Sequence, residues 1–464
     1  MKRNNLNTQS TFIEKGGIQL DFASKYFPPA LITRKAGNPS ILPDTESNAE
    51  RNVLEESYAD FFIEQSAYRQ LVTYVPNKKI PIYNWFKFKE GFSRQLAFNL
   101  INKFGLKKRA KLYDPFMGCG TTLLAGKEKG LKVIGTDMLP VAIFISQVKI
   151  TDWDDHKLLL QAVKKLFHTP FTTPTLALPN IKIINLAFPA EIQEQILFFK
   201  EQIDTFERPV RDFLLLGLLT ILESVSRTSK DGQFLRLVNK DIPNVRDTLY
   251  AVLMSMIGDL AVLTTPKTRV KAEARAGDAR QLCLPKKYHG NLDAVITSPP
   301  YLNRYDYSRS YALELCLLSV KSHQDMVAVR HSLLRSHIES RMHQNKQIYL
   351  PALNEILAQL QQRELNNERV PIMVQGYFED MNLAIKNLST YLKPGGKVAL
   401  VVANAQFAGE NIPTDLLLSE LAIRHGLQTE EIWITRYKGN SSQQMAVYGR
   451  RPVRESIVFW KKYA

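Results

Sequence analysis

Cysteine is scarce in this sequence, and long apolar runs are missing from it. Its 464 residues include three cysteines, Cys119, Cys283 and Cys316, which lie far apart and form no C-x-x-C pair. This pattern argues against a disulfide frame or a structural zinc site and favours a reducing compartment. No apolar run approaches the length of a transmembrane helix, and residues 1–17 lack the apolar core of a secretory signal. We therefore expect a cytoplasmic protein without a membrane span.

Acidic residues are outnumbered by basic ones. Lysine and arginine total 61 against 45 aspartate and glutamate residues, which gives a formal net charge of +16. A polyanion such as nucleic acid is a natural partner, because neutralising phosphates drives non-specific affinity; a merely basic soluble protein is the alternative. His331, His337 and His343 lie among arginines without surrounding carboxylates. We expect these histidines to be exposed or to face phosphates, and we expect no metal site.

The segment DAVITSPPY, residues 293–301, has the pattern of a short buried strand that runs into a rigid turn. Pro299 and Pro300 restrict two φ angles and remove two N–H donors, so the carbonyls of the turn point in set directions. A backbone carbonyl and the Ser298 hydroxyl can accept from an amino group on a flat ring, while Tyr301 stacks on the face of that ring. Because S-P-P-Y alone is short, an ordinary strand-to-loop turn is the alternative.

Residues 110–147 have the pattern strand, glycine loop, helix, strand and helix. This β-α-β unit predicts a parallel sheet with a ligand beyond the carboxyl ends of its strands. The loop DPFMGCGTT (114–122) matches neither common phosphate-binding pattern, and its leading carboxylate suits a positively charged ligand. Gly118 and Gly120 permit close backbone approach, and Asp137 ends the second strand, where a carboxylate can hold two ribose hydroxyls. A plain tight βα turn is the alternative.

The remaining segments are assigned around these two motifs. A helix is expected to begin at Ser93, its N-cap, and a strand to end at Ala276. The basic segment 226–241 is interpreted as a solvated connection. The expected divisions are an N-terminal extension (1–82), a catalytic domain (83–150, 266–319 and 376–464), a helical insertion (151–265), and a second helical insertion with possible target recognition (320–375).

The DPFMGCGTT loop and the TSPPY strand tip together resemble the S-adenosylmethionine-dependent amino-methyltransferases of DNA, which methylate N4 of cytosine or N6 of adenine. FKEGFS resembles an additional cofactor motif of that family, GTDMLP its ribose-binding strand, and GDARQL its adenine-binding segment. The resemblance implies an α/β fold with a Rossmann-like, seven-stranded methyltransferase sheet that ends in an antiparallel hairpin. Many members with a TSPPY tip have the opposite motif order, so either helical insertion is a candidate for target recognition.

The roles of the family's site residues carry over to the matching positions. The resemblance implies S-adenosylmethionine as cofactor, with Asp114 at its methionine part, Asp137 at its ribose and Asp278 at its adenine amino group. It implies a flipped base whose amino group donates to Ser298 and to the Pro299 carbonyl, beside Pro300, while Tyr301 stacks on the ring. No cysteine follows the prolines, which disfavours covalent methylation of cytosine C5. The other expected cofactor contacts are Pro115, Phe116, Gly118, Gly120, Thr121, Thr122, Phe92 and Ser93.

Within the resembled family, serine at the start of S-P-P-Y favours cytosine N4, so we predict that base in double-stranded DNA. We further expect a monomer on DNA, near the bacterial nucleoid, in restriction-modification or phage defence with a paired endonuclease. The alternatives are an adenine N6 enzyme, an RNA base amino-methyltransferase and a non-catalytic DNA-binding subunit. The predicted DNA contacts, chosen from charge and nearness to the motifs, are Arg304, Arg309, Lys230 and Arg236.

Overall fold

A mixed β-sheet lies at the centre of the structure, a computed structural model that describes residues 34–35, 48–231, 234–262, 270–340, 348–439 and 452–463. Within these ranges the sheet has nine strands in the order β1-β2-β12-β13-β9-β8-β3-β4-β7. The strands are β1 (Arg34–Lys35), β2 (Phe62–Glu64), β3 (Lys111–Asp114), β4 (Lys132–Asp137), β7 (Ala272–Ala276), β8 (Leu292–Thr297), β9 (Leu392–Ala403), β12 (Leu427–Lys438) and β13 (Val453–Lys462).

Seven of these strands, from β12 to β7, confirm the sheet that the resemblance implied. The strands β9, β8, β3, β4 and β7 are parallel, and β13 is antiparallel to both of its neighbours. The strand predicted to end at Ala276 is β7, and DAVIT forms most of β8. The N-terminal extension adds β2, which pairs in parallel with β12, and β1, which pairs with β2. The extension is therefore part of the sheet as well as packed on it.

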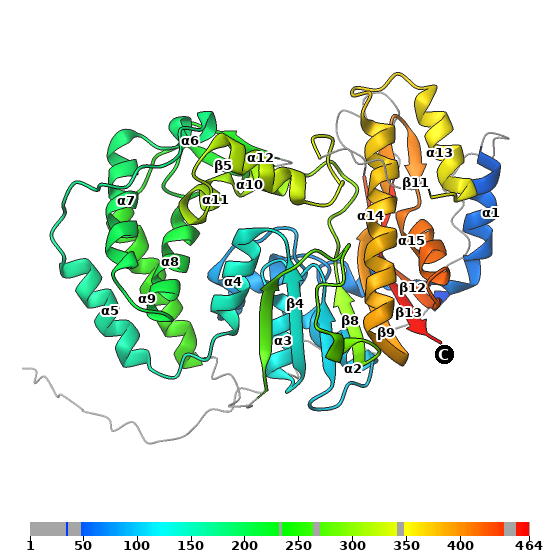
Figure 1. Ribbon diagram of the computed structural model, residues 1–464, viewed down its shortest axis with the longest axis horizontal. Coiled ribbons are helices and arrows are strands. Elements are labelled where there is room, and N and C mark those ends of the chain that lie inside the picture. The colour runs from blue at the N-terminus through cyan, green and yellow to red at the C-terminus, as the bar shows by residue number, and fades with distance from the viewer. Residues whose placement is uncertain are drawn as a thin grey trace, which may run out of the picture. The chain divides into compact units, whose positions relative to one another are not determined.

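Helices cover both faces of the sheet and form a separate group beside it (Figure 1). The helices are α1 (Ala49–Ser57), α2 (Arg94–Lys103), α3 (Thr121–Glu128), α4 (Pro140–Ile150), α5 (His156–His168), α6 (Lys182–Ala187), α7 (Ala190–Asp204), α8 (Val210–Ile221), α9 (Val245–Val262), α10 (Tyr307–Ser310), α11 (Ala312–Leu318), α12 (His323–Ser332), α13 (Pro351–Gln361), α14 (Val370–Tyr391) and α15 (Thr414–Ile423).

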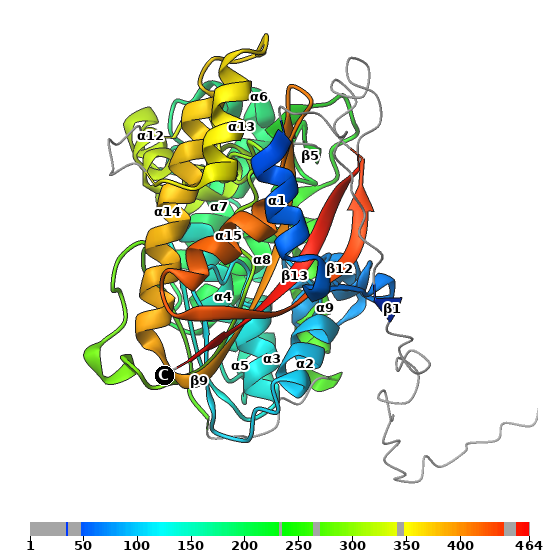
Figure 2. The same cartoon turned by 90° about the vertical axis from the view of Figure 1, so that its right-hand side faces the viewer.

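Alternation along the strands explains why each face has its own core. Leu112 and Ala294 pack in one cluster with α2 and α3, while their neighbours Tyr113 and Val295 pack in another with α13, α14 and α15. Successive side chains of a strand point to opposite faces, so a strand buried on both faces has a continuous apolar run. Figure 2 shows α1, α13, α14 and α15 in front of β9, β12 and β13.

The structure changes three expectations about the insertions. The segment predicted as a solvated connection forms a hairpin of β5 (Thr228–Asp231) and β6 (Phe234–Leu237), and α10 lies beside β6. The expected boundary at residue 376 falls inside α14. His337 is buried rather than exposed, neither of its ring nitrogens has a hydrogen-bond partner among the described residues, and burial lowers its pKa. His343 lies outside the described residues.

No helix in the described ranges is long and apolar enough to cross a membrane. The ranges also contain no group of three or more histidine, cysteine, aspartate or glutamate side chains that could hold a metal ion. Three apolar clusters, two on the sheet and one in the α5–α9 group, make up the core of this part of the chain.

Gly135 tests the contact between β4 and the elements above it. A Cβ at this position would lie 2.6 Å from Leu123 of α3 and 2.7 Å from the Met117 sulfur. We expect Gly135→Ala to lower the free energy of unfolding by about 1–3 kcal/mol through overpacking.

Gly258→Ala is the control, because Gly258 lies in α9 with open space around the added Cβ. There alanine should raise stability by up to about 1 kcal/mol. Denaturant unfolding of both variants measures the difference; effects of the same sign would contradict the packing.

Candidate active site

A cavity lies at the carboxyl ends of β3, β4, β7 and β8, where ligands bind in open parallel sheets. Its volume is about 870 Å³, part of which is open to solvent. The structure brings most of the predicted residues together there, although they are spread over more than 200 positions of the sequence. The predicted residues that line it are Phe92, Asp114, Pro115, Phe116, Gly118, Thr121, Thr122, Asp137, Asp278, Ser298 and Pro300.

Gly118 and Gly120 have different roles in the glycine loop. Both have positive φ, +50° and +78°, a conformation that glycine adopts without strain. Gly118 lines the cavity, and a Cβ on it would lie 3.0 Å from the Phe88 ring. Gly120 does not line the cavity; it is the N-cap of α3, and its missing side chain makes room for Ser146 of α4. The expectation that Gly120 contacts the ligand is therefore corrected to a packing role.

Two aspartates, the buried Asp114 and the half-buried Asp137, end the neighbouring strands β3 and β4. Asp114 Oδ1 accepts from Thr297 Oγ1 at 2.6 Å and from the Phe116 amide at 3.1 Å. Asp137 accepts from the Gly118 amide at 3.0 Å and the Leu139 amide at 2.9 Å. Burial raises the pKa of each carboxyl to about 6, and these hydrogen bonds oppose that rise. The cavity thus holds two oriented carboxyls that a positive ligand would favour in their charged form.

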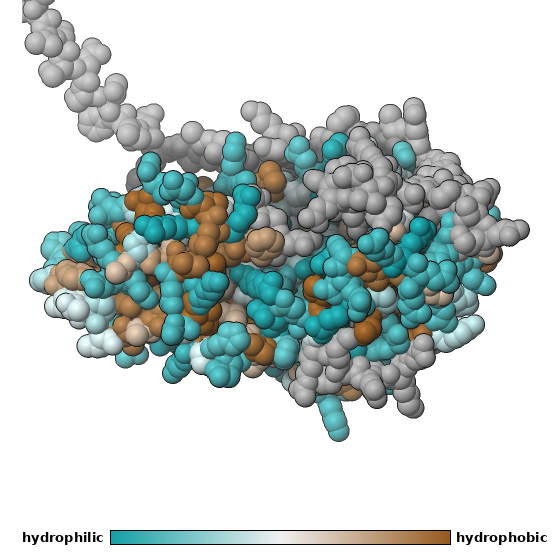
Figure 3. Space-filling model, turned by 90° about the horizontal axis from the view of Figure 1, so that it is seen from above, coloured by the Kyte–Doolittle hydropathy of each residue, from teal (hydrophilic) through white to brown (hydrophobic). Residues whose placement is uncertain are grey.

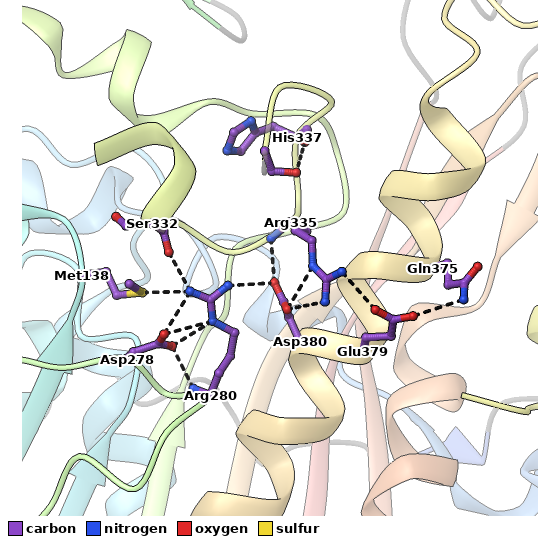
Figure 4. Close-up of polar contacts among 10 residues, drawn as sticks. Met138, Asp278, Arg280, Ser332, Arg335, His337, Gln375, Glu379 and Asp380 are labelled. Atoms are coloured by element: carbon purple, nitrogen blue, oxygen red, sulfur yellow. Dashed lines mark hydrogen bonds and ion pairs between the residues drawn. The ribbon is translucent and has the colours of Figure 1, made fainter. Parts of the chain in front are cut away.

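Asp278 lines the cavity in the turn after β7, but its carboxylate is not free. Arg280 donates to it through its backbone N–H at 2.9 Å and through Nε at 2.9 Å. The same guanidinium contacts the Met138 sulfur, the Ser332 carbonyl and Asp380 (Figure 4). An amino group of a ligand can therefore meet Asp278 only through lone pairs that Arg280 leaves available.

Part of the S-P-P-Y turn lines the cavity, and part of it contacts the sheet. Ser298 and Pro300 line the cavity, and Ser298 Oγ donates to the Val401 carbonyl of β9 at 3.1 Å. Tyr301 and Pro299 are outside the cavity lining. The Tyr301 hydroxyl donates to Glu455 of β13 at 3.1 Å, and burial raises its pKa. The Tyr301 ring is therefore held at its far end by the sheet.

Several lining residues were not predicted from the sequence. Phe88, Glu90 and Tyr307 form one wall, where Phe88 stacks on Tyr311 with ring centroids 5.1 Å apart and Tyr311 donates to Glu90 at 2.7 Å. The aromatic composition of the sequence around Phe88, Glu90 and Tyr307 was the signal that could have predicted their place in the cavity wall. Leu333, Leu334 and Ser336 close another side, and no motif in their segment indicated this role.

Two predicted site residues have structural roles instead. Ser93 is fully buried, and its hydroxyl accepts from the Leu96 amide as the N-cap of α2. This confirms the helix start, but Ser93 does not line the cavity. Lys230 is also buried; its ammonium forms an ion pair with Glu314 and lies 4.4 Å from the Tyr311 ring centroid. A buried, paired ammonium cannot contact a phosphate, so the prediction of Lys230 as a DNA contact is wrong.

The other three predicted DNA contacts lie at or near the surface. Arg236 is exposed on β6, and Arg309 is exposed on α10 with an ion pair to Glu339. Arg304 follows the S-P-P-Y turn with a positive φ of +68° and donates to the Asn366 side chain at 3.1 Å. None of these three arginines lines the cavity as the described residues form it.

Comparison with known proteins places this site in a family. No family model matches the chain. The chain is 33% identical over 477 aligned positions to type II methyltransferase M.BsoBI from Geobacillus stearothermophilus, covering 89% of this chain and 92% of that protein. It is 32% identical over 446 positions to type II methyltransferase M.AvaI from Nostoc sp., covering 88% and 92%. Among solved structures, the rRNA methyltransferase aviRa from Streptomyces viridochromogenes has a TM-score of 0.27 and 11% identity, covering 80% of this chain and 85% of that one.

The two type II relatives align with 89% and 88% of this chain and with 92% of their own length. The structure is consistent with this similarity: seven strands, from β12 to β7, form the central sheet, and the cavity lies at the carboxyl edge of its parallel strands. The chain therefore belongs to the type II methyltransferases, S-adenosylmethionine-dependent amino-methyltransferases of DNA.

Proposed function

We propose that this chain transfers a methyl group from S-adenosylmethionine to N4 of a cytosine that is flipped out of duplex DNA. The observation that carries the proposal is that Ser298 lines the same cavity as Asp114 and Asp137 while its hydroxyl proton is donated to the Val401 carbonyl. The hydroxyl therefore meets an incoming group as an acceptor, and an exocyclic amino group is the matching donor. Adenine N6 offers the same donor and is the second candidate base.

The cavity residues fit the cofactor. S-adenosylmethionine carries a sulfonium and an ammonium, and such neighbours stabilise the charged form of the buried Asp114 and the half-buried Asp137, each with a pKa of about 6. We assign Asp114 to the methionine part, Asp137 to the ribose hydroxyls and Asp278 to the adenine amino group. Gly118, Thr121 and the other lining residues supply close contact. When bound, the cofactor supplies a methyl group on a positively charged sulfur.

At the base end, the chain acts by positioning and electrostatics. The amino group of the base donates to Ser298 Oγ and to the Pro299 carbonyl, which turns the nitrogen lone pair toward the methyl group. A nitrogen–carbon bond forms, the carbon–sulfur bond breaks, and the nitrogen releases one proton. Tyr301 stacks on the base, and its hydrogen bond to Glu455 anchors the hydroxyl end of the side chain.

Duplex DNA is proposed to lie over the carboxyl edge of the sheet, with Arg236, Arg304 and Arg309 as backbone contacts. Figure 3 shows the molecule of Figure 1 as seen from above. Hydrophilic surface lies between the α5–α9 group and the α13–α15 group, and apolar side chains are visible over the α5–α9 group. We further propose that the chain acts as a monomer in the cytoplasm, near the nucleoid. There it would modify specific sites in a restriction-modification system with a paired endonuclease, and residues 320–375 would contribute to target recognition.

The nature of the product tests the choice of base. Unmethylated bacterial genomic DNA is incubated with tritiated S-adenosylmethionine, digested to nucleosides and separated by mass spectrometry. We expect label in N4-methylcytosine. Label in N6-methyladenine would keep the mechanism and change the base, and label only in an RNA substrate would move the chain to the RNA enzymes. No label in either, together with intact DNA binding, would indicate a non-catalytic subunit.

The hydroxyl of Ser298 is tested by Ser298→Ala. Loss of one acceptor for the amino group is expected to lower kcat by about 10²–10³-fold, while the Kd for S-adenosylhomocysteine changes little because the cofactor contacts remain. Ser322→Ala is the matched control, since Ser322 only caps α12 and should leave kcat unchanged. Equal kcat values for Ser298→Ala and the parent would remove Ser298 from the mechanism.

The buried aspartates predict how cofactor affinity depends on pH. Their pKa is about 6 in the free protein, and a bound cation lowers it. Affinity for S-adenosylmethionine should therefore be constant above pH 7 and should fall as the pH drops through 6. Protonation at low pH does not unfold the protein through these groups, because a raised pKa makes the folded state more stable as the pH falls.

Calorimetric titration of S-adenosylmethionine binding from pH 5 to 8 measures the profile. Asp114→Asn should bind more weakly with a flatter profile; an unchanged affinity at pH 5 for the parent would contradict the assignment.

A further inference from the structure

The segment from Leu333 to Ser336 covers one side of the cofactor cavity although it lies far from every recognised motif. Leu333, Leu334 and Ser336 line the cavity. Arg335, between them, points the opposite way, toward α14, as Figure 4 shows. One short segment therefore presents apolar and hydroxyl groups to the ligand on one side and a buried guanidinium to a helix on the other. We call this segment, residues 333–336, the cover segment.

Arg335 fastens the cover segment to α14. Its Nε and Nη2 donate to Asp380 Oδ1 at 3.0 and 2.6 Å, its backbone N–H donates to Asp380 Oδ2 at 3.0 Å, and its Nη1 pairs with Glu379 at 2.9 Å. Arg335 and Asp380 are 5% and 2% exposed. Gly376 makes this possible, because a Cβ there would lie 2.9 Å from the Arg335 side chain. The attachment is thus a buried ion pair in which two guanidinium nitrogens donate to one carboxylate oxygen, and such charge-assisted hydrogen bonds are strong.

Arg280 joins the same carboxylate to the cavity wall. Its Nη1 donates to Asp380 Oδ2 at 3.2 Å, its Nη2 donates to the Ser332 carbonyl at 2.7 Å, and its Nε donates to Asp278 at 2.9 Å. One guanidinium therefore contacts the turn after β7, the residue before the cover segment and α14. Of these contacts, Asp278 lines the cavity, and Ser332 directly precedes Leu333, which also lines it.

A second attachment does not depend on these charges. The Arg304 amide donates to the Ser336 carbonyl at 3.1 Å, which ties the far end of the cover segment to the loop after the catalytic turn. Loss of the ion pairs should therefore loosen the cover segment without detaching it or displacing Ser298.

Stability alone is a weak reason for this network. Removing charges from water is costly, and buried ion pairs are often no more stabilising than apolar side chains of similar volume. A positional role accounts for the arrangement better, since each contact of Arg280 and Asp380 fixes a segment that lines, or directly adjoins, one end of the cavity.

We propose that Arg280, Arg335 and Asp380 are positioning residues for cofactor binding: they clamp the cover segment over the adenosine end of the cavity and hold the Asp278 carboxylate toward it. The proposal rests on the assignment of Asp278 to the adenine and not on which base is methylated. The clamp sets affinity for the adenosine part, while Asp114 acts on the methionine part.

The test compares two probes in the absence of DNA. S-adenosylhomocysteine contains both parts of the cofactor, and 5′-methylthioadenosine contains only the adenosine part. We expect Arg280→Lys, which keeps the charge but loses the planar fork, to raise the calorimetric Kd of both probes at least tenfold. Asp114→Asn should weaken S-adenosylhomocysteine and leave 5′-methylthioadenosine within twofold. In turnover, Arg280→Lys should raise the KM for S-adenosylmethionine and leave kcat within threefold.

Arg51→Lys is the matched control, because Arg51 is 1% exposed and bridges Glu355 and Glu410 at 2.6 and 2.9 Å away from the cavity. It should lower the thermal midpoint of the ligand-free protein much as Arg280→Lys does, with both probe affinities unchanged. Asp380→Asn is a second test of the clamp, with the same expected loss of affinity. A folded Arg280→Lys that binds both probes within twofold of the parent would overturn the proposal, whatever base the enzyme methylates.

Discussion

The position of the buried Asp114 and the half-buried Asp137 at the ends of two adjacent parallel strands is the constraint on which the site depends. Desolvation disfavours both carboxylates, and hydrogen bonds from Thr297, Phe116, Gly118 and Leu139 offset part of that cost. Each aspartate is thereby oriented before a ligand arrives, and a cationic ligand then relieves the remaining cost. The glycine loop exists in this form because Gly118 and Gly120 adopt positive φ values, which let the loop turn back and donate to Asp137.

Segments from distant parts of the chain complete the cavity around this pair. The aromatic wall comes from residues just before α2 and after β8, and the cover segment follows α12. A hydrogen bond from Tyr311 to Glu90 supports the aromatic wall, and buried ion pairs of Arg280 and Arg335 with Asp380 hold the cover segment. Residues of the second helical insertion, 320–375, therefore help to build the cavity wall.

Net charge overstates the number of cations available to DNA. The formal charge of +16 includes Lys230, Arg51, Arg335 and Arg454, each of which is buried and paired with carboxylates. These cations hold elements together. Exposed side chains such as Arg236 and Arg309 remain the proposed phosphate contacts, so the basic composition agrees with a DNA substrate but does not identify the residues that meet it.

Local sequence determined the β-α-β unit, the strand ends at Asp114, Asp137 and Ala276, the N-cap at Ser93 and the S-P-P-Y turn, because strand alternation, glycine conformation and proline geometry act within a few residues. Tertiary structure decided the rest. It buried Lys230 and His337, placed Tyr301 against Glu455, gave Gly120 a packing role and brought the cover segment to the cavity. Those outcomes depend on contacts between residues that lie well apart in the sequence, and desolvation and ion pairing at such contacts leave no short-range pattern.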